Sequence, residues 1–218
     1  MIKRKKIFFI GVSLILAFLL WTLLLCIVDV QEIGPQGSSV GFATLNGFVH
    51  KCVGVNIALY TLTDWLSLLP IGVAFGFSIL GLVQWIKRKS LIKVDYSILL
   101  LGGFYIIVML VYILFELLFI NYRPVLINGY LEVSYPSSTT MLVMCIIPTA
   151  MMQFDTRIRN KTFRKLVLFL LAAFTIFMVL GRLAAGVHWI TDIIGGALFS
   201  AGITLIYYSI NDFKVAQD

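Results

Sequence analysis

Long apolar runs without a charged side chain alternate along the chain with short polar segments. Six of these uncharged runs cover residues 7–28, 65–86, 96–115, 133–154, 166–181 and 193–210. Because a helix needs about 20 apolar residues to cross the hydrocarbon core of a bilayer, the pattern predicts six membrane-spanning helices. The last two runs reach full length if Arg182 and Asp192 lie near helix ends, at the interface. Five spans and a buried re-entrant segment are the alternative.

The composition supports an all-α integral membrane protein. Of 218 residues, 61% are hydrophobic and 12% are charged, which is far from the composition of a soluble globular protein. No second domain is indicated, so we expect residues 1–218 to form a single membrane-embedded domain. The 3 cysteines show neither a disulfide framework nor metal-ligand spacing, and we expect no metal and no cofactor.

Basic residues gather on one predicted side of the membrane. Of 17 Lys and Arg residues, 14 lie at positions 3–6, 87–93, 157–165 and 214. By the positive-inside rule this side is cytoplasmic, and both termini are then cytoplasmic. The net charge of +7 therefore indicates orientation, and we expect no nucleic-acid partner. The three remaining basic residues, Lys51, Arg123 and Arg182, lie on the outside.

The longest segment between spans covers residues 29–64 and contains a second helical pattern. Its apolar positions recur at helical spacing opposite polar ones. The apolar set is Phe42, Leu45, Phe48, Val49, Cys52 and Val53, and the polar set is Thr44, Asn46 and Lys51. The pattern predicts an amphipathic helix on the outer surface, which we interpret as a lid over the outer mouth of the bundle.

The connection between the fifth and sixth spans has the pattern Arg182-x5-His188-x3-Asp192. Because the connection is short, the two spans are antiparallel neighbours and Arg182 can face His188. On a helix, His188 and Asp192 share one face. An Asp that accepts a hydrogen bond from one imidazole nitrogen fixes the tautomer and leaves the other nitrogen free as a nucleophile.

Two further outer segments contain groups suited to an anion. Arg123-Pro124 follows the third span, and the fourth span begins with Pro-Ser-Ser-Thr-Thr at residues 136–140. Arg123 and Arg182 provide fork-shaped donors for phosphate oxygens. A helix N-terminus has free amides and a positive dipole end, so an anion there is expected to contact Ser137, Ser138 and Thr139. Together the three segments predict a phosphate site with a histidine nucleophile, since ionisable residues at a membrane are costly without a function.

The three segments resemble the motifs of the type 2 phosphatidic acid phosphatase superfamily, a group of membrane lipid phosphatases. Its motifs run Lys-x6-Arg-Pro, Pro-Ser-Gly-His and Ser-Arg-x5-His-x3-Asp. The chain matches them at Arg123, Pro124, Pro136, Ser137, Arg182, His188 and Asp192. The resemblance implies that His188 forms a phosphohistidine without a metal, that Asp192 orients it, and that Arg123 and Arg182 hold the phosphoryl oxygens.

Two departures from these motifs affect the expected chemistry. Thr139 stands where the family has the histidine that protonates the leaving group, and Glu116 stands where it has a lysine; Ser138 and Gly181 are milder changes. A threonine hydroxyl is too weak an acid for this role, which typically contributes about 10²–10⁴-fold. A lipid diphosphate, which expels a phosphate monoester, then becomes a better substrate than a lipid monophosphate, which must expel an alkoxide.

Two residues are candidates to replace the missing acid. Glu116 precedes Arg123 by two helical turns, so on one helix it shares a face with Arg123. In an apolar pocket its pKa would rise and make it an acid, and otherwise it forms a salt bridge to Arg123. His50, the only other histidine, is the second candidate. The alternative for His50 is that it is a solvated residue at the membrane interface without a catalytic role.

The sequence is thus interpreted as a six-helix membrane lipid phosphatase that acts on a phospholipid or polyprenyl phosphate, with polyprenyl diphosphates favoured. The main alternative is a catalytically impaired protein that binds or transports lipid phosphates, and a purely structural membrane protein is the third. The compact architecture favours a bacterial plasma membrane.

The distribution of charge generates a prediction about topology. Reporters fused at either terminus should be accessible from the cytoplasmic side only, whereas a reporter inserted at Gly37 should be accessible from outside. Protease protection in sealed, right-side-out vesicles measures both. A Gly37 reporter found inside would place the candidate site on the opposite face.

Overall fold

The computed structural model describes residues 2–215, and for residues 212–215 it describes the backbone alone. The predicted cytoplasmic termini include residues 1 and 216–218, which lie outside this range. The described secondary structure is helical apart from isolated β-bridges. The elements are α1 (Ile2–Ile27), η1 (Pro35–Gly37), α2 (Ala43–Val53), α3 (Ile57–Leu66), α4 (Leu68–Arg88), η2 (Leu91–Lys93), α5 (Tyr96–Leu118), α6 (Ser138–Arg157), α7 (Lys161–Ala184) and α8 (Ile190–Val215).

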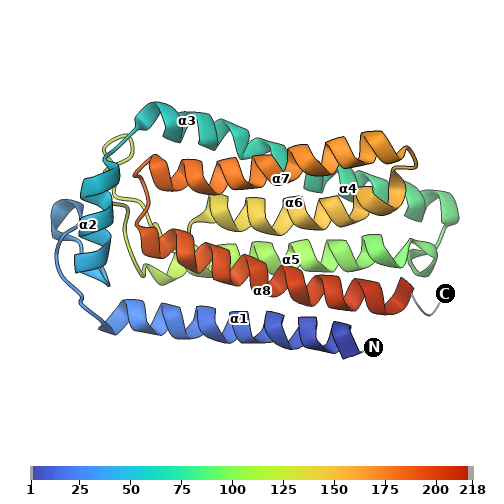
Figure 1. Ribbon diagram of the computed structural model, residues 1–218, viewed down its shortest axis with the longest axis horizontal. Helices are drawn as coiled ribbons and strands as arrows, with labels where there is room; N and C mark the ends of the chain where they lie inside the picture. Colours follow the sequence, from blue (N-terminus) through green and yellow to red (C-terminus); the bar gives the residue numbers. More distant parts are fainter. Residues whose placement is uncertain (1, 216–218) are drawn as a thin grey trace.

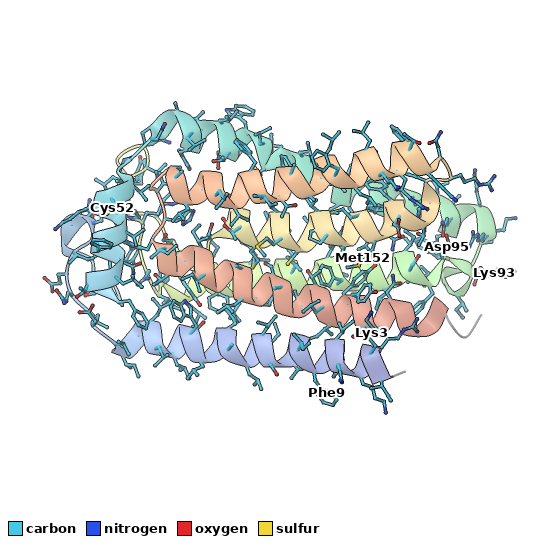
Figure 2. All side chains as sticks on the ribbon, viewed as in Figure 1. Lys3, Phe9, Cys52, Lys93, Asp95 and Met152 are labelled. Atoms are coloured by element: carbon cyan, nitrogen blue, oxygen red, sulfur yellow. The ribbon has the colours of Figure 1, made fainter. Side chains whose placement is uncertain are left out.

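The long helices run side by side, and α2 lies across one end of the bundle (Figure 1). We call this end the α2 end; α1 begins and α8 ends at the opposite end. Cys52 lies at the α2 end, whereas Lys3 and Lys93 lie toward the opposite end (Figure 2). This arrangement agrees with the predicted sorting of basic segments to one side. Which end faces the cytoplasm remains a prediction.

Within the described residues, five helices are long and apolar enough to cross a membrane: Ile2–Ile27, Ile57–Arg88, Tyr96–Leu118, Lys161–Ala184 and Ile190–Asn211. The chain is therefore an integral, multi-pass membrane protein. The remaining predicted span, the fourth (133–154), corresponds to α6, which begins only at Ser138. This helix lies among α4, α5, α7 and α8, and its Thr149 and Gln153 side chains are buried. Because α6 packs against protein on most sides, it carries polar side chains that a lipid-facing helix would not tolerate.

The second span starts earlier than the predicted range of 65–86. The side chain of Asn56 accepts a hydrogen bond from the Leu59 amide at 2.9 Å and so caps α3. Ser67 then keeps helical angles (φ −66°, ψ −16°), so α3 leads directly into α4. Gly181 of α7 lets α3 approach, because a Cβ atom there would lie 2.9 Å from the methyl group of Thr63. Residues predicted as a loop are therefore part of a helix that packs on α7.

The α2 helix occupies the segment in which an amphipathic helix was predicted, but of the predicted polar residues only Asn46 faces the bundle, while Thr44 and Lys51 are exposed. Asn46 is fully buried, whereas Phe48 is 67% exposed. The Asn46 amide donates to the Gly41 carbonyl at 2.7 Å and to the Thr191 hydroxyl at 3.0 Å. Since Thr191 is in the first turn of α8, this contact ties α2 to the start of that helix.

Tyr135 fixes the loop that precedes α6. Its ring stacks on Phe18 with ring centroids 6.3 Å apart, and it meets Phe115 edge-on at 5.8 Å. Its hydroxyl lies 2.7 Å from that of Thr22 in α1. Buried aromatic contacts of this kind contribute packing beyond the area they cover. They hold the neighbouring residue, Ser134, at the α2 end of the bundle.

Candidate functional site

The loop between α7 and α8 places His188 inside the α2 end of the bundle, where it is only 3% exposed. Gly186 makes this loop possible because its φ is +65° and a Cβ atom there would lie 1.8 Å from the Gly54 carbonyl. The Asn56 amide donates to the Ala185 carbonyl at 3.0 Å and fixes the loop against the start of α3. The histidine is thus held by backbone contacts on both sides.

Two arginines, Arg123 and Arg182, converge on one nitrogen of this histidine. Nε2 of His188 lies 3.1 Å from Nη1 of Arg123 and 3.2 Å from Nη2 of Arg182. Arg123 is 8% exposed and Arg182 is 1% exposed. Because a guanidinium group only donates hydrogen bonds, Nε2 accepts from both arginines and carries no proton. This leaves the proton of the neutral ring on Nδ1.

Asp192 lies beside His188 without contacting it directly. The distance from Nδ1 of His188 to Oδ2 of Asp192 is 3.8 Å, which is too long for a hydrogen bond. The hydroxyl of Ser134 lies between them, 2.9 Å from Nδ1 and 2.5 Å from Oδ2. The expectation that Asp192 itself accepts from the imidazole is therefore corrected. The carboxylate also accepts from the Trp189 amide at 2.9 Å.

Both arginines have carboxylate partners, but these only partly satisfy the buried guanidinium groups. Nε of Arg123 lies 3.0 Å from Glu132, and Nη1 of Arg182 lies 3.7 Å from Asp64. The guanidinium carbons of Arg182 and Arg123 lie 4.9 Å and 5.9 Å from the centre of the Tyr60 ring. Among the described residues, Nε of either arginine finds no acceptor in hydrogen-bonding geometry. A buried guanidinium with unused donors is costly, and an anion with several oxygens would satisfy both.

The electrostatic environment keeps His188 neutral. Burial lowers its pKa well below the usual value, and the positive charges of Arg123 and Arg182 lower it further. The lone pair on Nε2 is therefore available at neutral pH. An unprotonated imidazole nitrogen beside two guanidinium groups that can bind phosphate oxygens can act as a nucleophile toward phosphorus.

The start of α6 lies next to the start of α8. The Ser137 amide donates to the Asp192 carbonyl at 3.1 Å, so this amide is already used. The first helical hydrogen bond runs from Met141 to Ser137, which leaves the amides of Ser138 and Thr139 at the open N-terminus of the helix. Thr139 is 5% exposed. The structure thus brings this turn close to Asp192, with Ser138 and Thr139 as its available donors.

Glu116 does not lie as predicted. The α5 helix ends at Leu118, and Phe119 adopts left-handed angles, so the helical turns assumed to connect Glu116 with Arg123 do not exist. Glu116 is exposed, and its carboxylate interacts with the hydroxyl of Tyr112. The ion-pair partner of Arg123 is Glu132 instead.

His50 lies near the site but on another surface. Its ring meets Trp189 edge-on, with centroids 5.5 Å apart. Both rings line a cavity of about 430 Å³ beside α2, together with Lys51. Burial lowers the pKa of His50. Within the described part of the chain, His50 makes no hydrogen bond to His188 or to either arginine.

Several residues of the site were not predicted from the sequence. They are Tyr60, Thr63, Asp64, Asn121, Glu132 and Ser134. Thr63 and Asp64 come just before the second apolar run and were assigned to the outer loop, although they follow Tyr60 by three and four residues, which is the spacing of a helix face. Ser134 precedes Tyr135-Pro136 directly, and nothing in its neighbourhood separates it from an ordinary turn residue.

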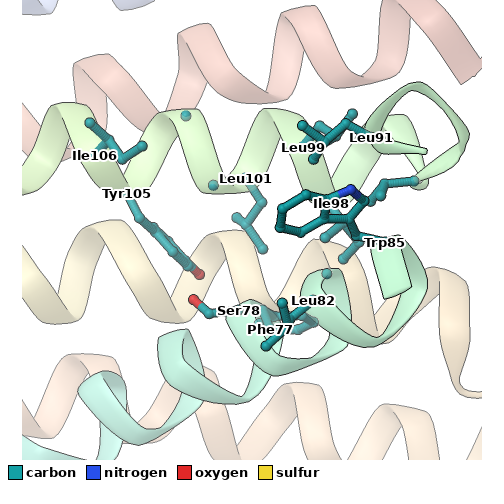
Figure 3. Close-up of a pocket in the computed structure, with 14 residues that line it drawn as sticks. Phe77, Ser78, Leu82, Trp85, Leu91, Ile98, Leu99, Leu101, Tyr105 and Ile106 are labelled. Carbon is teal, nitrogen blue, oxygen red and sulfur yellow. The ribbon is translucent and has the colours of Figure 1, made fainter. Parts of the chain in front are cut away.

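A groove runs between α4 and α5, from the first turn of α4 toward the end of that helix away from α2. Two cavities of about 370 Å³ and 270 Å³ are both lined by Tyr105 and otherwise mostly by apolar side chains. Figure 3 shows the larger one, with Tyr105 and Ile106 toward one end and Trp85 toward the other. The lining positions on α4 recur every three or four residues, which places them on one helix face: Ile71, Ala74, Ser78, Gly81, Leu82 and Trp85.

The fold and the site together define a multi-pass membrane protein with a buried histidine between two arginines at one end of a helix bundle. The PAP2 superfamily pattern matches residues 71–216, and the chain belongs to this superfamily. A solved PAP2-type phosphatidylglycerolphosphate phosphatase from Bacillus subtilis is similar in structure, with a TM-score of 0.55 and 20% sequence identity. That match covers 95% of this chain and 97% of the other. A search of curated proteins found no match by sequence.

The pKa of His188 generates a prediction that needs no substrate. With only two histidines in the chain, a His50→Gln variant labelled with ¹⁵N-histidine shows the ring nitrogens of His188 alone by NMR. Their chemical shifts should show that the ring stays neutral well below pH 6.5. Arg123→Ala removes a positive neighbour and should raise the pKa of His188. An imidazole that is already protonated near pH 7 in the His50→Gln protein would contradict the geometry described above.

Proposed function

We propose that the protein hydrolyses a phosphate from a membrane lipid, with His188 as the nucleophile, at the outer face of the membrane. The observation that carries this proposal is Nε2 of His188, a neutral nitrogen that lies 3.1 Å from Arg123 and 3.2 Å from Arg182. This arrangement joins a nucleophile to groups that bind phosphoryl oxygens. Membership of the PAP2 superfamily and the likeness to a phosphatidylglycerolphosphate phosphatase support it.

The reaction would proceed in two displacements. First, the Nε2 lone pair bonds to phosphorus while the bond from phosphorus to the leaving oxygen breaks. The guanidinium groups of Arg123 and Arg182 turn from Nε2 to the phosphoryl oxygens and balance the charge that spreads over them. Water then attacks the phosphohistidine, the N–P bond breaks, and inorganic phosphate leaves with the second water proton released to solvent. His188 is then neutral again.

The leaving group decides which lipids are suitable. Thr139 cannot supply a proton, and Glu116 is exposed beside Tyr112, so we assign no general acid to the site. A lipid diphosphate expels a phosphate monoester, which is stable as an anion and takes its proton from water. A lipid monophosphate must expel an alkoxide, which is far more basic. We therefore favour a lipid diphosphate as the substrate.

The groove between α4 and α5 supports a long isoprenoid as the lipid chain. From Ile71 to Trp85 the groove follows α4 for about 21 Å at 1.5 Å per residue. One leaflet of hydrocarbon is about 15 Å thick, half of a bilayer core of about 30 Å. A groove that continues past the midplane suits a polyprenyl chain better than the acyl chains of one leaflet. Its outer end begins one turn after α3, which carries Asp64.

A catalytically impaired protein that binds or transports lipid phosphates is the second candidate function. The absence of a proton donor at Thr139 and the loss of the family's lysine at Glu116 favour it, because both changes spare the arginines. In this case no variant turns over lipid. Arg123→Ala or Arg182→Ala should then weaken binding of a lipid phosphate by about 2–5 kcal/mol, as expected when one partner of a buried charge pair is removed. Titration with a fluorescent lipid phosphate in detergent measures this loss.

Hydrolysis and its covalent intermediate provide the direct test of the enzymatic function. Purified protein should release phosphate from a polyprenyl diphosphate, and His188→Ala should abolish the release. A phosphoenzyme trapped by rapid quenching should be labile to acid, as phosphohistidine is. His50→Ala is the matched control and should keep its turnover, because His50 packs on Trp189 outside the arginine site. Undiminished turnover in His188→Ala would assign the nucleophile elsewhere.

Restoring a proton donor should change substrate preference in a defined direction. Thr139→His places an imidazole in the first turn of α6, where the family carries its acid. Hydrolysis of lipid monophosphates should rise by about 1–3 orders of magnitude, and hydrolysis of diphosphates should rise less. The ratio of kcat/KM for the two substrates measures this effect. An equal gain for both substrates would show that protonation of the leaving group does not limit the monophosphate reaction.

A further inference from the structure

The hydroxyl of Ser134 separates the two groups that were expected to contact each other. Ser134 lies in the loop between α5 and α6 and is 3% exposed. Its Oγ atom is 2.9 Å from Nδ1 of His188 and 2.5 Å from Oδ2 of Asp192, whereas these two atoms are 3.8 Å apart. Within the described part of the chain, every hydrogen-bonded path from Nδ1 to the carboxylate passes through this hydroxyl.

The direction of each hydrogen bond follows from the donors present. Nε2 of His188 faces N–H groups of Arg123 and Arg182, which cannot accept. Nδ1 therefore carries the ring proton and donates it to Oγ of Ser134. An ionised Asp192 can only accept, so the hydroxyl proton of Ser134 points to Oδ2. Each of the three groups has one consistent role, and Nε2 keeps an unprotonated lone pair that accepts from the two arginines.

The position of Ser134 is fixed independently of His188. Its amide donates to the Asn121 carbonyl at 2.8 Å. The Asn121 side chain donates to the other Asp192 oxygen, Oδ1, at 3.4 Å. The next residue, Tyr135, is held in the aromatic core. Ser134 and Asp192 therefore form one rigid unit, and the ring of His188 is oriented by the hydroxyl that this unit presents.

We propose that Ser134 is a positioning residue that transmits the charge of Asp192 to His188 and holds the imidazole in the Nδ1–H tautomer. The catalytic consequence rests on the proposed function, whereas the tautomer does not. When Nε2 bonds to phosphorus, the ring becomes positively charged. The Nδ1 proton then remains on the ring, and the chain through Ser134 to Asp192 stabilises the charge without any proton transfer.

The tautomer can be observed directly because the chain has only two histidines. ¹⁵N-histidine NMR of the His50→Gln protein should show His188 with its proton on Nδ1. Ser134→Ala should replace this single tautomer by a mixture or by the Nε2–H form, whereas Ser134→Thr should preserve it. Ser200→Ala is the structural control: Ser200 is also buried, and its hydroxyl contacts the Met141 carbonyl and Cys145 in the bundle core.

Two results would overturn the proposal. One is an Nε2–H tautomer in the His50→Gln protein, which requires no further variant and therefore does not depend on whether Ser134→Ala folds. The other is an unchanged Nδ1–H signal in a folded Ser134→Ala protein, since this would mean that the two arginines at Nε2 fix the tautomer without Ser134. The thermal unfolding midpoints of Ser134→Ala and Ser200→Ala establish that each protein is folded.

Turnover separates this proposal from the proposed function. If the protein hydrolyses lipid diphosphates, Ser134→Ala should lower kcat by about 10–100-fold, by analogy with the outer partners of metal-bound histidines, with KM nearly unchanged. Ser134→Thr should restore most of kcat. If no protein turns over and the tautomer still depends on Ser134, the positioning role stands and the hydrolase function fails. A loss in KM alone would mean that Ser134 acts on lipid binding, and the positioning role would be rejected.

Discussion

A guanidinium ion inside a helix bundle has to be surrounded by groups that accept its hydrogen bonds or balance its charge. Arg182 is in this position, because it is 1% exposed and its nearest carboxylate, Asp64, is 3.7 Å away. Much of the α2 end can be understood from this demand. It explains why α3 continues into α4 and packs Tyr60 and Thr63 on α7, and why His188 is kept neutral as an acceptor. An anionic ligand can accept the guanidinium hydrogen bonds that the protein itself leaves unpaired.

The apolar runs and basic clusters predicted the class of protein and the direction of most helices, because a bilayer restricts both strongly. The motif Arg182-x5-His188-x3-Asp192 predicted the centre of the site for a local reason: one short connection carries all three residues. Arg123 was found because it is one of three basic residues on the predicted outer side and begins an Arg-Pro pair that matches the family motif. The expected proximity of Arg123 to His188 is present in the structure at 3.1 Å.

The errors arise where a residue's role depends on elements far apart in the chain. Glu116 was placed on the face of Arg123 because the third helix was assumed to continue, whereas left-handed angles at Phe119 end it. Asp64 was assigned to a loop because the apolar run begins after it, although capping by Asn56 starts the helix earlier. Ser134 has no local signal at all. Its function is defined by atoms that lie 54 and 58 residues away in sequence, and only the folded chain brings these together.

The length of the second span determines how deep the site lies in the membrane and therefore how easily water reaches it. Together α3 and α4 cover 32 residues, or about 48 Å at 1.5 Å per residue, whereas the hydrocarbon core is about 30 Å thick. With Arg88 at one boundary, the first turns of α3 project beyond the opposite one. Tyr60 and Asp64, and with them the arginines, then lie at the level of the lipid headgroups. For the proposed phosphohistidine, this depth would allow bulk water to reach the N–P bond while the lipid chain stays in the bilayer.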